Sequence, residues 1–265
     1  MNILVAINKA YFPYFLSMIT SLTEHNEGRH KVFIVSNDVD TSFIQKAQEK
    51  NKLPENIDVA IIKFDDDLVK DAPQIKWWTK EVYYRLFAKE YLPDDIDRIL
   101  YLDCDLIVKG NIEELYYSDF QGNYYIGATN IHSPFMKKFL QIKNGAKRKS
   151  VYINTGVLLI NLQRLREEQD VSKIIAYIKR KGWLLCCPDQ DVMHGLYGDK
   201  ILLCDGFIYN LSDRAIRYYK RKNKREITIP WVDENVKIIH YIGKNKPWKE
   251  DYKGILQGYY EKYKS

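Results

Sequence analysis

Short runs of β-branched and aliphatic residues alternate with segments of helical periodicity over the first 110 residues of the chain. Apolar residues fill nearly every position of these runs, which is typical of parallel strands covered on both faces. The segments between them repeat apolar residues at the spacing of amphipathic helices. This βαβ alternation predicts an α/β fold with a mainly parallel sheet and flanking helices. The predicted strands are Ile3–Ile7, Val32–Val35, Val59–Ile62 and Ile99–Leu102, and the predicted helices are Pro13–His25, Thr41–Asn51 and Trp77–Tyr91.

From about residue 151 the pattern of apolar positions changes. Short strands are predicted among helical stretches, at Gly156–Asn161, Ile201–Leu203 and Val236–Ile239. The main domain predicted from this pattern spans residues 1–211 and is completed by residues 236–249. Residues 212–265 are expected to form a small basic, aromatic-rich appendage.

The excess positive charge lies in this C-terminal region. The whole chain has a net charge of +6, and residues 212–265 hold 14 basic residues against 7 acidic ones. Basic residues interleaved with aromatic ones suit an anionic membrane surface, although a solvated helical face has the same composition. No recognised motif supports a nucleic-acid partner, and none is expected. The residues concerned are Arg214, Arg217, Lys220, Arg221, Lys222, Lys224 and Arg225, with Tyr218, Tyr219, Trp231, Trp248, Tyr252, Tyr259, Tyr260 and Tyr263.

Other features of the chain favour a cytoplasmic protein. No apolar run approaches the roughly 18–20 residues of a membrane-spanning helix. The first strand begins at once, without the basic segment and cleavage site of a signal peptide. The four cysteines have neither paired metal-binding spacing nor disulfide-scaffold density, so we expect reduced thiols. The expected location is cytoplasmic, with contact to the inner membrane face through residues 212–265.

Two carboxylates follow the fourth predicted strand. Asp103 and Asp105 are two positions apart, so on an extended chain their side chains point the same way. Converging carboxylates repel each other unless a cation lies between them. Ligands of parallel sheets bind beyond the carboxyl ends of the strands, where this motif lies. An Asp-x-Asp alone is also a common acidic turn, so the accompanying motifs decide its meaning.

Four further segments accompany Leu-Tyr-Leu-Asp-Cys-Asp (100–105). They are the first-strand segment Ala-Ile-Asn-Lys-Ala-Tyr (6–11); Tyr-Tyr-Arg-Leu (83–86); Ile-Asn-Thr-Gly-Val-Leu-Leu-Ile-Asn-Leu (153–162) with Pro-Asp-Gln-Asp (188–191); and His-Tyr-Ile-Gly-Lys-Asn-Lys-Pro-Trp (240–248). In this order they resemble glycosyltransferase family 8, which includes bacterial lipooligosaccharide galactosyltransferases and glycogenin. The resemblance extends from Asn2 to about Lys249. It implies a Rossmann-like GT-A fold and a retaining enzyme that moves a hexose, galactose or glucose, from a UDP-sugar to a saccharide acceptor on a lipid or glycoprotein.

The resemblance also implies a metal-dependent site. Departure of a nucleoside diphosphate concentrates negative charge, which a divalent cation stabilises as a Lewis acid. Asp103 and Asp105 are expected to hold this ion, with His240 as the third ligand. An imidazole beside carboxylates favours Mn²⁺, with Mg²⁺ as the alternative ion. Gly243 and Lys246 are expected to contact the phosphates, through close backbone approach and a point charge.

The donor nucleotide has its own expected contacts. Arg85 is expected to reach phosphate or sugar oxygens, although an exposed helical arginine is often only a solvated charge. Asn8 stands where the family usually offers an aspartate to the uracil ring, and its amide retains the ability to pair with a base edge. Tyr11 is expected to stack on the base. The motif positions Ala6 and Cys104 complete this part of the expected site.

The donor sugar is expected to meet Asn154, Thr155, Asp189 and Gln190. Helix capping is the alternative role for Asp189. Retention requires either a carboxylate nucleophile or attack on the face from which the diphosphate departs. Gln190, where the family places its residue under the sugar, is a weak nucleophile. We therefore expect front-face attack, with Gln190 stabilising the oxocarbenium-like centre and Asp191 as the alternative nucleophile.

Two other readings of the same motifs are weighed against this one. Haloacid-dehalogenase phosphatases also place Asp-x-Asp after an apolar strand, but near the chain start and with Thr or Val where this chain has Ile107. A catalytically weak sugar-binding or partner-binding module on the same fold is the other alternative. The intact set of metal and donor residues favours an enzyme over such a module.

Overall fold

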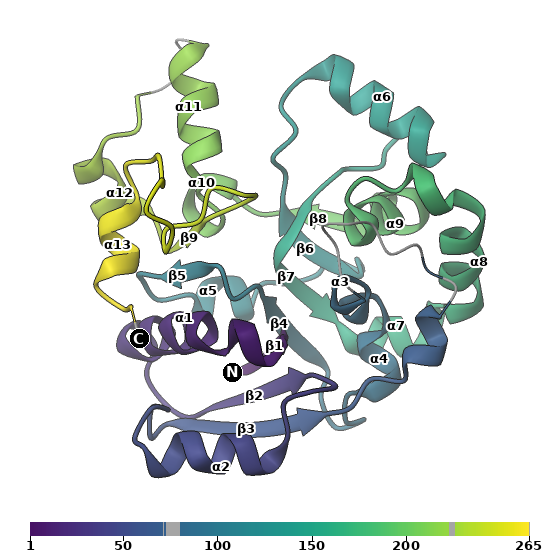
Figure 1. Ribbon diagram of the computed structural model, residues 1–265. Helices are drawn as coiled ribbons and strands as arrows, with labels where there is room; N and C mark the ends of the chain where they lie inside the picture. The colour runs from purple at the N-terminus through teal and green to yellow at the C-terminus, as the bar shows by residue number, and fades with distance from the viewer. Residues whose placement is uncertain (71, 73–79, 223–225, 265) are drawn as a thin grey trace.

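The computed structural model describes residues 1–70, 72, 80–222 and 226–264. These residues form a seven-stranded sheet in the order β3-β2-β1-β4-β7-β6-β8 (Figure 1). β7 is antiparallel to β4 and β6, whereas the other four strand pairs are parallel. The predicted α/β fold with a mainly parallel sheet is therefore confirmed. The strands are β1 (Asn2–Ala6), β2 (His30–Val35), β3 (Ile57–Ile62), β4 (Arg98–Leu102), β6 (Tyr125–Ala128), β7 (Asn154–Asn161) and β8 (Ile201–Leu203).

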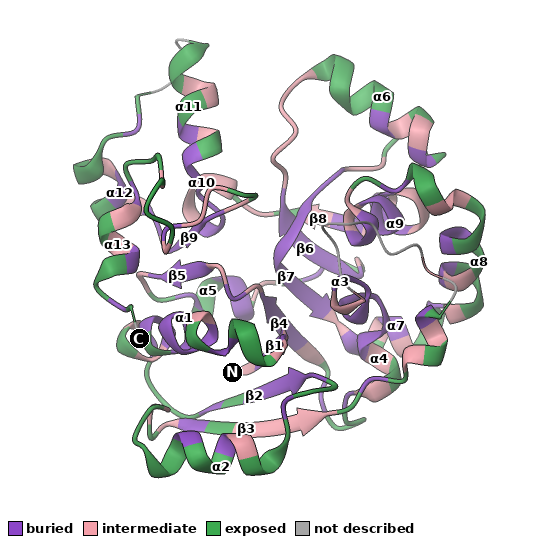
Figure 2. Cartoon of the chain, in the orientation of Figure 1, coloured by how far each residue is buried: buried purple, intermediate pink, exposed green. Residues whose placement is uncertain are grey.

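Apolar side chains project from both faces of this sheet and form two cores. On β1, Ile3 and Val5 join the core that includes Phe15 and Met18 of α1. Leu4, between them, joins the opposite core, which includes residues of α3, α8 and α9. Successive side chains of a strand point to opposite faces, so a strand buried on both sides is apolar throughout. Figure 2 shows this burial along the central strands.

Helices cover both faces of the sheet. Those between β1 and β4 are α1 (Phe12–His25), α2 (Thr41–Glu49), α3 (Glu81–Tyr84) and α4 (Ala88–Tyr91), with the 3₁₀ turns η1 (Lys9–Tyr11), η2 (Asp66–Val69) and η3 (Arg85–Phe87). Those that follow are α5 (Glu113–Tyr116), α6 (Pro134–Asn144), α7 (Leu162–Glu168), α8 (Val171–Lys181), α9 (Pro188–Tyr197), α10 (Gly206–Tyr209), α11 (Asp213–Arg221), α12 (Ile229–Asn235) and α13 (Gln257–Glu261), with η4 (Gly182–Leu184) and η5 (Gly198–Lys200).

The predicted helix Trp77–Tyr91 is only partly tested, because residues 77–79 lie outside the described residues. From Glu81 onward the segment consists of α3, η3 and α4 in succession, so the expectation of one continuous helix is wrong there. The tighter 3₁₀ turn of η3 contains Arg85, Leu86 and Phe87, all buried. Burial of a charged residue in the middle of this segment accompanies the change of helical geometry.

A separate two-stranded ribbon brings the C-terminal region to the sheet. β5 (Leu106–Val108) pairs antiparallel with β9 (Ile238–His240), and Leu106 stands opposite His240. The predicted strand Val236–Ile239 is therefore displaced toward the C-terminus and includes His240 itself. β5 and β6 were not predicted, since strands of three or four residues show too little of their period.

The aromatic residues of the C-terminal region pack against the protein and are buried or half-buried. Residues from Leu211 to Tyr263 form a third apolar cluster with Ile107 of β5. The Trp248 ring stacks on Tyr14 of α1 at a centroid distance of 3.7 Å and an interplanar angle of 16°. None of the eight tail aromatics is exposed, and Tyr260 and Tyr263 are buried. The division of the chain at residue 211 remains a prediction.

The contact between Trp248 and Tyr14 predicts a stability difference between two tryptophans. Trp248→Ala should lower the free energy of unfolding by about 2 kcal/mol, because a half-buried ring loses its packing partners. Trp183→Ala is the matched control, because Trp183 is 84 % exposed, and should change stability by less than about 0.5 kcal/mol. Urea unfolding followed by circular dichroism measures both. Equal losses would show that the stacked ring does not hold the C-terminal region.

Candidate active site

Three of the predicted metal ligands meet at the carboxyl end of β4. Asp103 and Asp105 lie between β4 and β5, and His240 ends β9. One potential ligand atom from each of the three lies within 4.8 Å of the other two. His240 Nε2 is 3.1 Å from Asp105 Oδ1 and 3.8 Å from Asp103 Oδ2. The fold thus brings together two neighbouring carboxylates and an imidazole that lies 135 residues or more further along the chain.

Backbone hydrogen bonds fix the positions of these three residues. The amide of Asp103 donates to the carbonyl of Gly156 at 2.8 Å, which ties the turn after β4 to β7. The carbonyl of Asp105 accepts from the amide of Tyr241 at 2.9 Å, next to the β5–β9 ladder. His240 is therefore placed by strand register and not by contacts of its side chain alone.

Gly156 keeps the space beside the cluster open. A Cβ on this residue would lie 2.2 Å from His240 Cε1 and 2.6 Å from Asp103 Oδ2. Neither position is compatible with the present side-chain arrangement. The sequence motif contains Gly156, but its role was not predicted, because β7 had to be placed against the loop after β4 before the proximity was visible.

A chain of hydrogen bonds orients the imidazole. The Gly156 amide donates to Asn154 Oδ1 at 3.2 Å, so this oxygen is an acceptor. Asn210 Nδ2 also donates to it at 3.0 Å, which turns Asn210 Oδ1 toward His240 Nδ1 at 2.8 Å. Nδ1 then carries a proton. Nε2, 3.1 Å from Asp105 Oδ1, donates to that carboxylate when the ring is protonated and presents its lone pair to a metal ion when the ring is neutral. Such an arrangement suits a metal cation, and Asn210 was missed because no motif marks it.

Lys246 contributes positive charge to the same cluster. Its ammonium group donates to Asp105 Oδ2 and, at 2.8 Å, to the carbonyl of Tyr241. Burial alone would raise the pKa of Asp105, but Lys246 and His240 outweigh it and hold the pKa well below its usual range. Asp105 is therefore ionised, as a metal ligand must be. Gly243, in the loop before Lys246, has φ +88°, a conformation that favours glycine.

Arg85 is buried and paired, so the alternative of a solvated helical charge is wrong. Its guanidinium donates to Asp103 Oδ1 at 3.1 Å and to the carbonyl of Thr155 at 2.9 Å, and lies 3.3 Å from Asp189 Oδ2. The Arg85 Cζ also lies 3.9 Å from the centre of the Tyr101 ring. Burial would lower the pKa of Arg85, but Asp103, Tyr101 and Asp189 raise it above its usual value.

Asp189 faces this guanidinium from the first turn of α9. It is buried and accepts a hydrogen bond from Thr155 Oγ1 at 2.5 Å. Burial raises its pKa, although Arg85 and Thr155 act in the opposite direction. The N-cap residue of α9 is Cys187, which gives no side-chain cap, but the Asp189 carboxylate accepts from the backbone amide of Gln190 in the first turn.

The two predicted catalytic residues have different surroundings. Gln190 is half-buried, and its side-chain amide makes no hydrogen bond to the described part of the chain. Asp191 is fully buried. Its carboxylate accepts from Lys143, Asn144, Tyr152 and the amides of Cys186 and Cys187, at 2.8–3.2 Å. Gln190 is thus free to meet a ligand, whereas the carboxylate of Asp191 is occupied by protein donors.

The remaining predicted donor residues lie around the start of α1 and the loop after β4. Ala6 ends β1, and Asn8 Oδ1 accepts from the Tyr11 amide at 3.2 Å, leaving the Asn8 amide nitrogen for other partners. Tyr11 is 44 % exposed. Burial raises the pKa of its phenol above the usual value, against the opposing effect of Lys246. Cys104 is buried and points its thiol into the core instead of the site.

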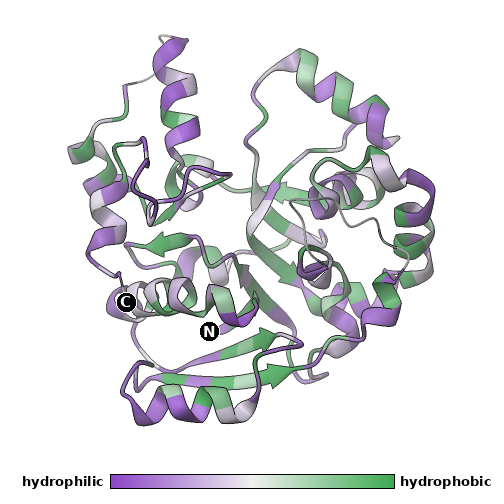
Figure 3. Cartoon of the chain, viewed as in Figure 1, coloured by the Kyte–Doolittle hydropathy of each residue, from purple (hydrophilic) through white to green (hydrophobic). Residues whose placement is uncertain are grey.

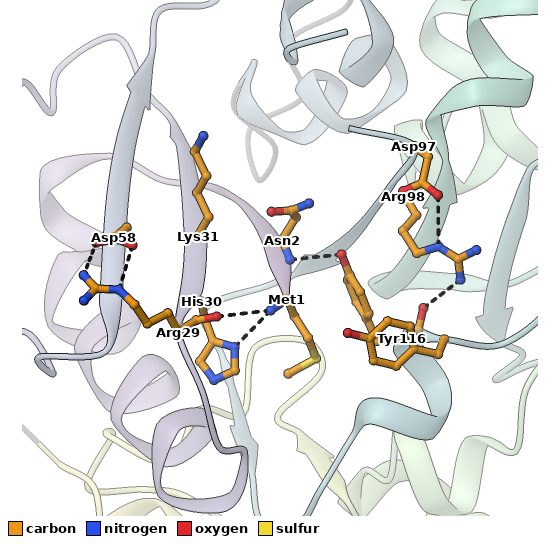
Figure 4. Close-up of a pocket in the computed structure, with 10 residues that line it drawn as sticks. Met1, Asn2, Arg29, His30, Lys31, Asp58, Asp97, Arg98 and Tyr116 are labelled. Carbon is orange, nitrogen blue, oxygen red and sulfur yellow. Dashed lines mark hydrogen bonds and ion pairs between the residues drawn. The ribbon is translucent and has the colours of Figure 1, made fainter. Parts of the chain in front are cut away.

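A cavity of about 540 Å³ lies at the opposite end of the strands from the cluster, where β1, β2 and β4 begin (Figure 4). Its charged side chains are largely paired with one another. Arg29 Nη2 lies 2.7 Å from Asp58 Oδ1, and Arg98 donates to the carbonyl of Tyr116 at 3.2 Å. No predicted site residue lines this cavity.

The geometry predicts that an added methyl group at Gly156 disrupts metal binding. Gly156→Ala should weaken Mn²⁺ affinity by at least about 100-fold, since His240 and Asp103 must move apart to admit it. Gly258→Ala is the matched control, because its Cβ would meet no atom within 4 Å, and should bind Mn²⁺ as the parent does. Titration calorimetry with Mn²⁺ and UDP measures both. Undiminished affinity in Gly156→Ala would refute the cluster as a metal site.

The hydrogen-bond chain predicts a separate effect of Asn210. Asn210→Leu should lower Mn²⁺ affinity by about 10-fold to 100-fold, because His240 loses the acceptor that sets its proton on Nδ1. Two-dimensional NMR of the histidine ring nitrogens should show a change of tautomer in this variant. Retained affinity and tautomer would mean that Asn210 is not needed to orient the imidazole.

Comparisons with known proteins agree on one family. The model of the family "Glycosyl transferase family 8" matches residues 2–252. A lipopolysaccharide 1,2-glucosyltransferase of Escherichia coli is 26 % identical over 94 % of this chain and 72 % of its own length. A lipopolysaccharide 1,3-galactosyltransferase of Salmonella typhimurium is 28 % identical over 72 % of this chain and 56 % of its own length.

A solved structure confirms the fold. The crystal structure of the galactosyltransferase LgtC with donor and acceptor sugar analogues has a TM-score of 0.78 and 22 % sequence identity to this chain. It covers 99 % of this chain, and 95 % of its own length is covered. The common fold agrees with the match of the family model over residues 2–252, which shows the family: the chain belongs to glycosyl transferase family 8.

Proposed function

We propose that the protein is a retaining hexosyltransferase that moves galactose or glucose from a UDP-sugar to a saccharide acceptor on a lipid or glycoprotein. The observation that carries the proposal is the grouping of Asp103, Asp105 and His240 beside Lys246 and Arg85. Two anionic ligands, an imidazole and two cations in one place suit a metal-bound diphosphate. Family membership supports the class of reaction.

The named relatives support the choice of sugar and acceptor. One similar protein is a lipopolysaccharide 1,2-glucosyltransferase and another is a lipopolysaccharide 1,3-galactosyltransferase. Both names describe transfer of a hexose to a glycolipid. A lipid-linked saccharide is therefore the acceptor that we favour for this chain.

The residues present fit a divalent cation. Two carboxylates, one imidazole lone pair and the space that Gly156 leaves open form a mixed oxygen and nitrogen donor set. Such a set favours Mn²⁺, with Mg²⁺ as the alternative ion. When bound, the ion supplies Lewis-acid stabilisation of the charge on the departing diphosphate.

The cationic side chains act on the same charge. Lys246 lies against Asp105, and its ammonium group is close enough to be shared with a phosphate oxygen. Arg85 retains a buried Nε without a partner in the described residues, while its other nitrogens hold Asp103 and Asp189 in place. The left-handed turn at Gly243 lets the chain fold back so that Lys246 reaches the cluster.

The sugar is proposed to lie between β7 and the start of α9. Asp189 is held by Thr155 and Arg85, which fixes an acceptor for sugar hydroxyls. Gln190 has an unused amide that is available to stabilise positive charge at the anomeric carbon. Because Asp191 is occupied by five donors, front-face attack is favoured over a covalent intermediate. In this route the leaving phosphate oxygen takes the proton of the acceptor hydroxyl.

A groove of about 180 Å³ beside this site is proposed to receive the acceptor. It lies between the segment before α6 and the start of α11, and Ile242, next to Gly243, is part of its wall. Its lining is mainly apolar with several polar groups among it, which is usual for a ligand site. The lining residues include Asn130, His132, Ser133, Met136, Arg214 and Tyr218.

The expected cytoplasmic location and membrane contact belong to the same proposal. The exposed basic residues of α11, which include Arg217, Lys220 and Arg221, supply positive charge for an anionic membrane. Six of the eight tail aromatics pack in or against the third apolar cluster and so are not available as interfacial anchors. Lys224 and Arg225 lie outside the described residues.

A donor screen tests the reaction. UDP-galactose or UDP-glucose with Mn²⁺ should release UDP, and removal of the metal by a chelator should stop the release. Asp103→Asn and His240→Ala should each lower kcat/KM by about 1,000-fold, whereas Gln190→Ala should lower it by about 10-fold to 100-fold. Asp58→Asn, an exposed carboxylate at the distant cavity, is the matched control.

The outcome separates the enzyme from its alternatives. Full activity in Asp103→Asn or in metal-free protein would contradict the metal-dependent mechanism. Donor binding without UDP release from any sugar nucleotide would favour a binding module. A glycosyl adduct trapped on Asp191 would overturn front-face attack, and an inverted anomeric configuration in the product would overturn retention.

A further inference from the structure

Helix α6 carries an apolar stripe on the side that faces away from the protein. Phe135, Phe139 and Ile142 are 78 %, 50 % and 69 % exposed. At about 100° of rotation per residue, the three lie within an arc of about 60°. Leu140 and Asn144, the buried residues of α6, lie on the opposite side of the helix. The stripe therefore does not serve the core of this chain (Figures 2 and 3).

Another exposed aromatic lies near the end of this helix. Lys181, in the last turn of α8, donates to the carbonyl of Lys143 in the last turn of α6 at 2.6 Å. Trp183 follows two residues later and is 84 % exposed. Large exposed apolar residues that gather on one surface mark an interaction site.

The segment that carries the stripe has only basic charges. Residues 130–150 hold six lysines and arginines and no acidic residue. Of these, Lys137, Lys138, Arg148 and Lys149 form no ion pair with any residue that the structure describes. An apolar stripe flanked by lysines is typical of a helix that lies in the interface of a membrane with anionic lipids.

The second rim of the acceptor groove has the same charge. α11 projects from the same end of the molecule as α6 (Figure 1). Its exposed residues Arg214, Arg217 and Lys220 are basic. The groove between the two helices is lined by residues of both segments. A flat anionic surface at this end would meet apolar side chains on one rim and positive charge on both.

We infer that α6 docks the protein on anionic lipid bilayers, with Phe135, Phe139 and Ile142 inserted at the level of the headgroups and Lys138, which flanks the stripe, on lipid phosphates. No helix in the described part of the chain is long and apolar enough to cross a membrane. The docking is therefore peripheral. It does not rest on the proposed reaction, since it is measured without donor or acceptor.

Vesicle co-sedimentation of the full chain tests this docking. The protein should bind vesicles of mixed phosphatidylcholine and phosphatidylglycerol, and bind vesicles of phosphatidylcholine alone much more weakly. Phe135→Ser/Phe139→Ser/Ile142→Ser should lower the affinity for mixed vesicles by at least about 10-fold, because apolar insertion is lost. Lys138→Glu should lower it by about 10-fold, because a charge beside the stripe is reversed.

The control removes exposed apolar residues elsewhere. Tyr117→Ser/Ile229→Ser/Ile255→Ser changes residues that are 65 %, 40 % and 48 % exposed and should leave vesicle binding unchanged. Thermal melting and circular dichroism establish that each variant is folded. A vesicle-induced blue shift of tryptophan fluorescence that disappears in Trp183→Phe would place the bilayer beside α6.

Three results would overturn the inference. The first is equal binding of the α6 variant and the parent chain. The second is equal binding to vesicles with and without phosphatidylglycerol, or none to either. The third is a parent chain that self-associates in light scattering, with an α6 variant that becomes monomeric but binds vesicles as before, which would make the stripe a contact between two copies.

Discussion

The mutual repulsion of Asp103 and Asp105 is the constraint that organises this site. The turn between β4 and β5 places both carboxylates in one small region, where like charges raise the energy of the folded protein. Positive or metal-binding groups from distant segments compensate this repulsion. Lys246 pairs with Asp105, Arg85 pairs with Asp103, and His240 directs a ring nitrogen between them. The same arrangement that compensates the carboxylates prepares a place for a cation.

The fold supplies these groups through strand register and not through long flexible side chains. Pairing of β5 with β9 sets His240 opposite Leu106, so the imidazole cannot approach or leave without moving a strand. Behind it, the amide of Gly156 determines the orientation of Asn154, then of Asn210, and finally of the histidine ring. A buried chain of this kind is stable only when every member is satisfied. Rigid ligands lose little entropy on binding a metal, which favours affinity.

The sequence predicted the parts of the site that lie within continuous motifs. The uninterrupted apolar runs predicted the parallel strands, and the motif around Asp103 predicted the carboxylates. Asn210 and the steric role of Gly156 were not predictable, because both depend on contacts between segments about 30 to 85 residues apart. The composition of the tail resembles an interfacial belt, but composition does not show that six of its eight aromatics pack in or against the apolar cluster beside β5.

Metal-dependent function at this site requires that the three ligands share one ion. Anomalous diffraction at the manganese edge, from crystals soaked with Mn²⁺ and UDP, measures this directly. We predict a single peak bonded to carboxylate oxygens of Asp103 and Asp105 and to Nε2 of His240, at about 2.0–2.3 Å. Ordered UDP in the cleft with no manganese between these side chains, or with the ion on other ligands, would contradict it.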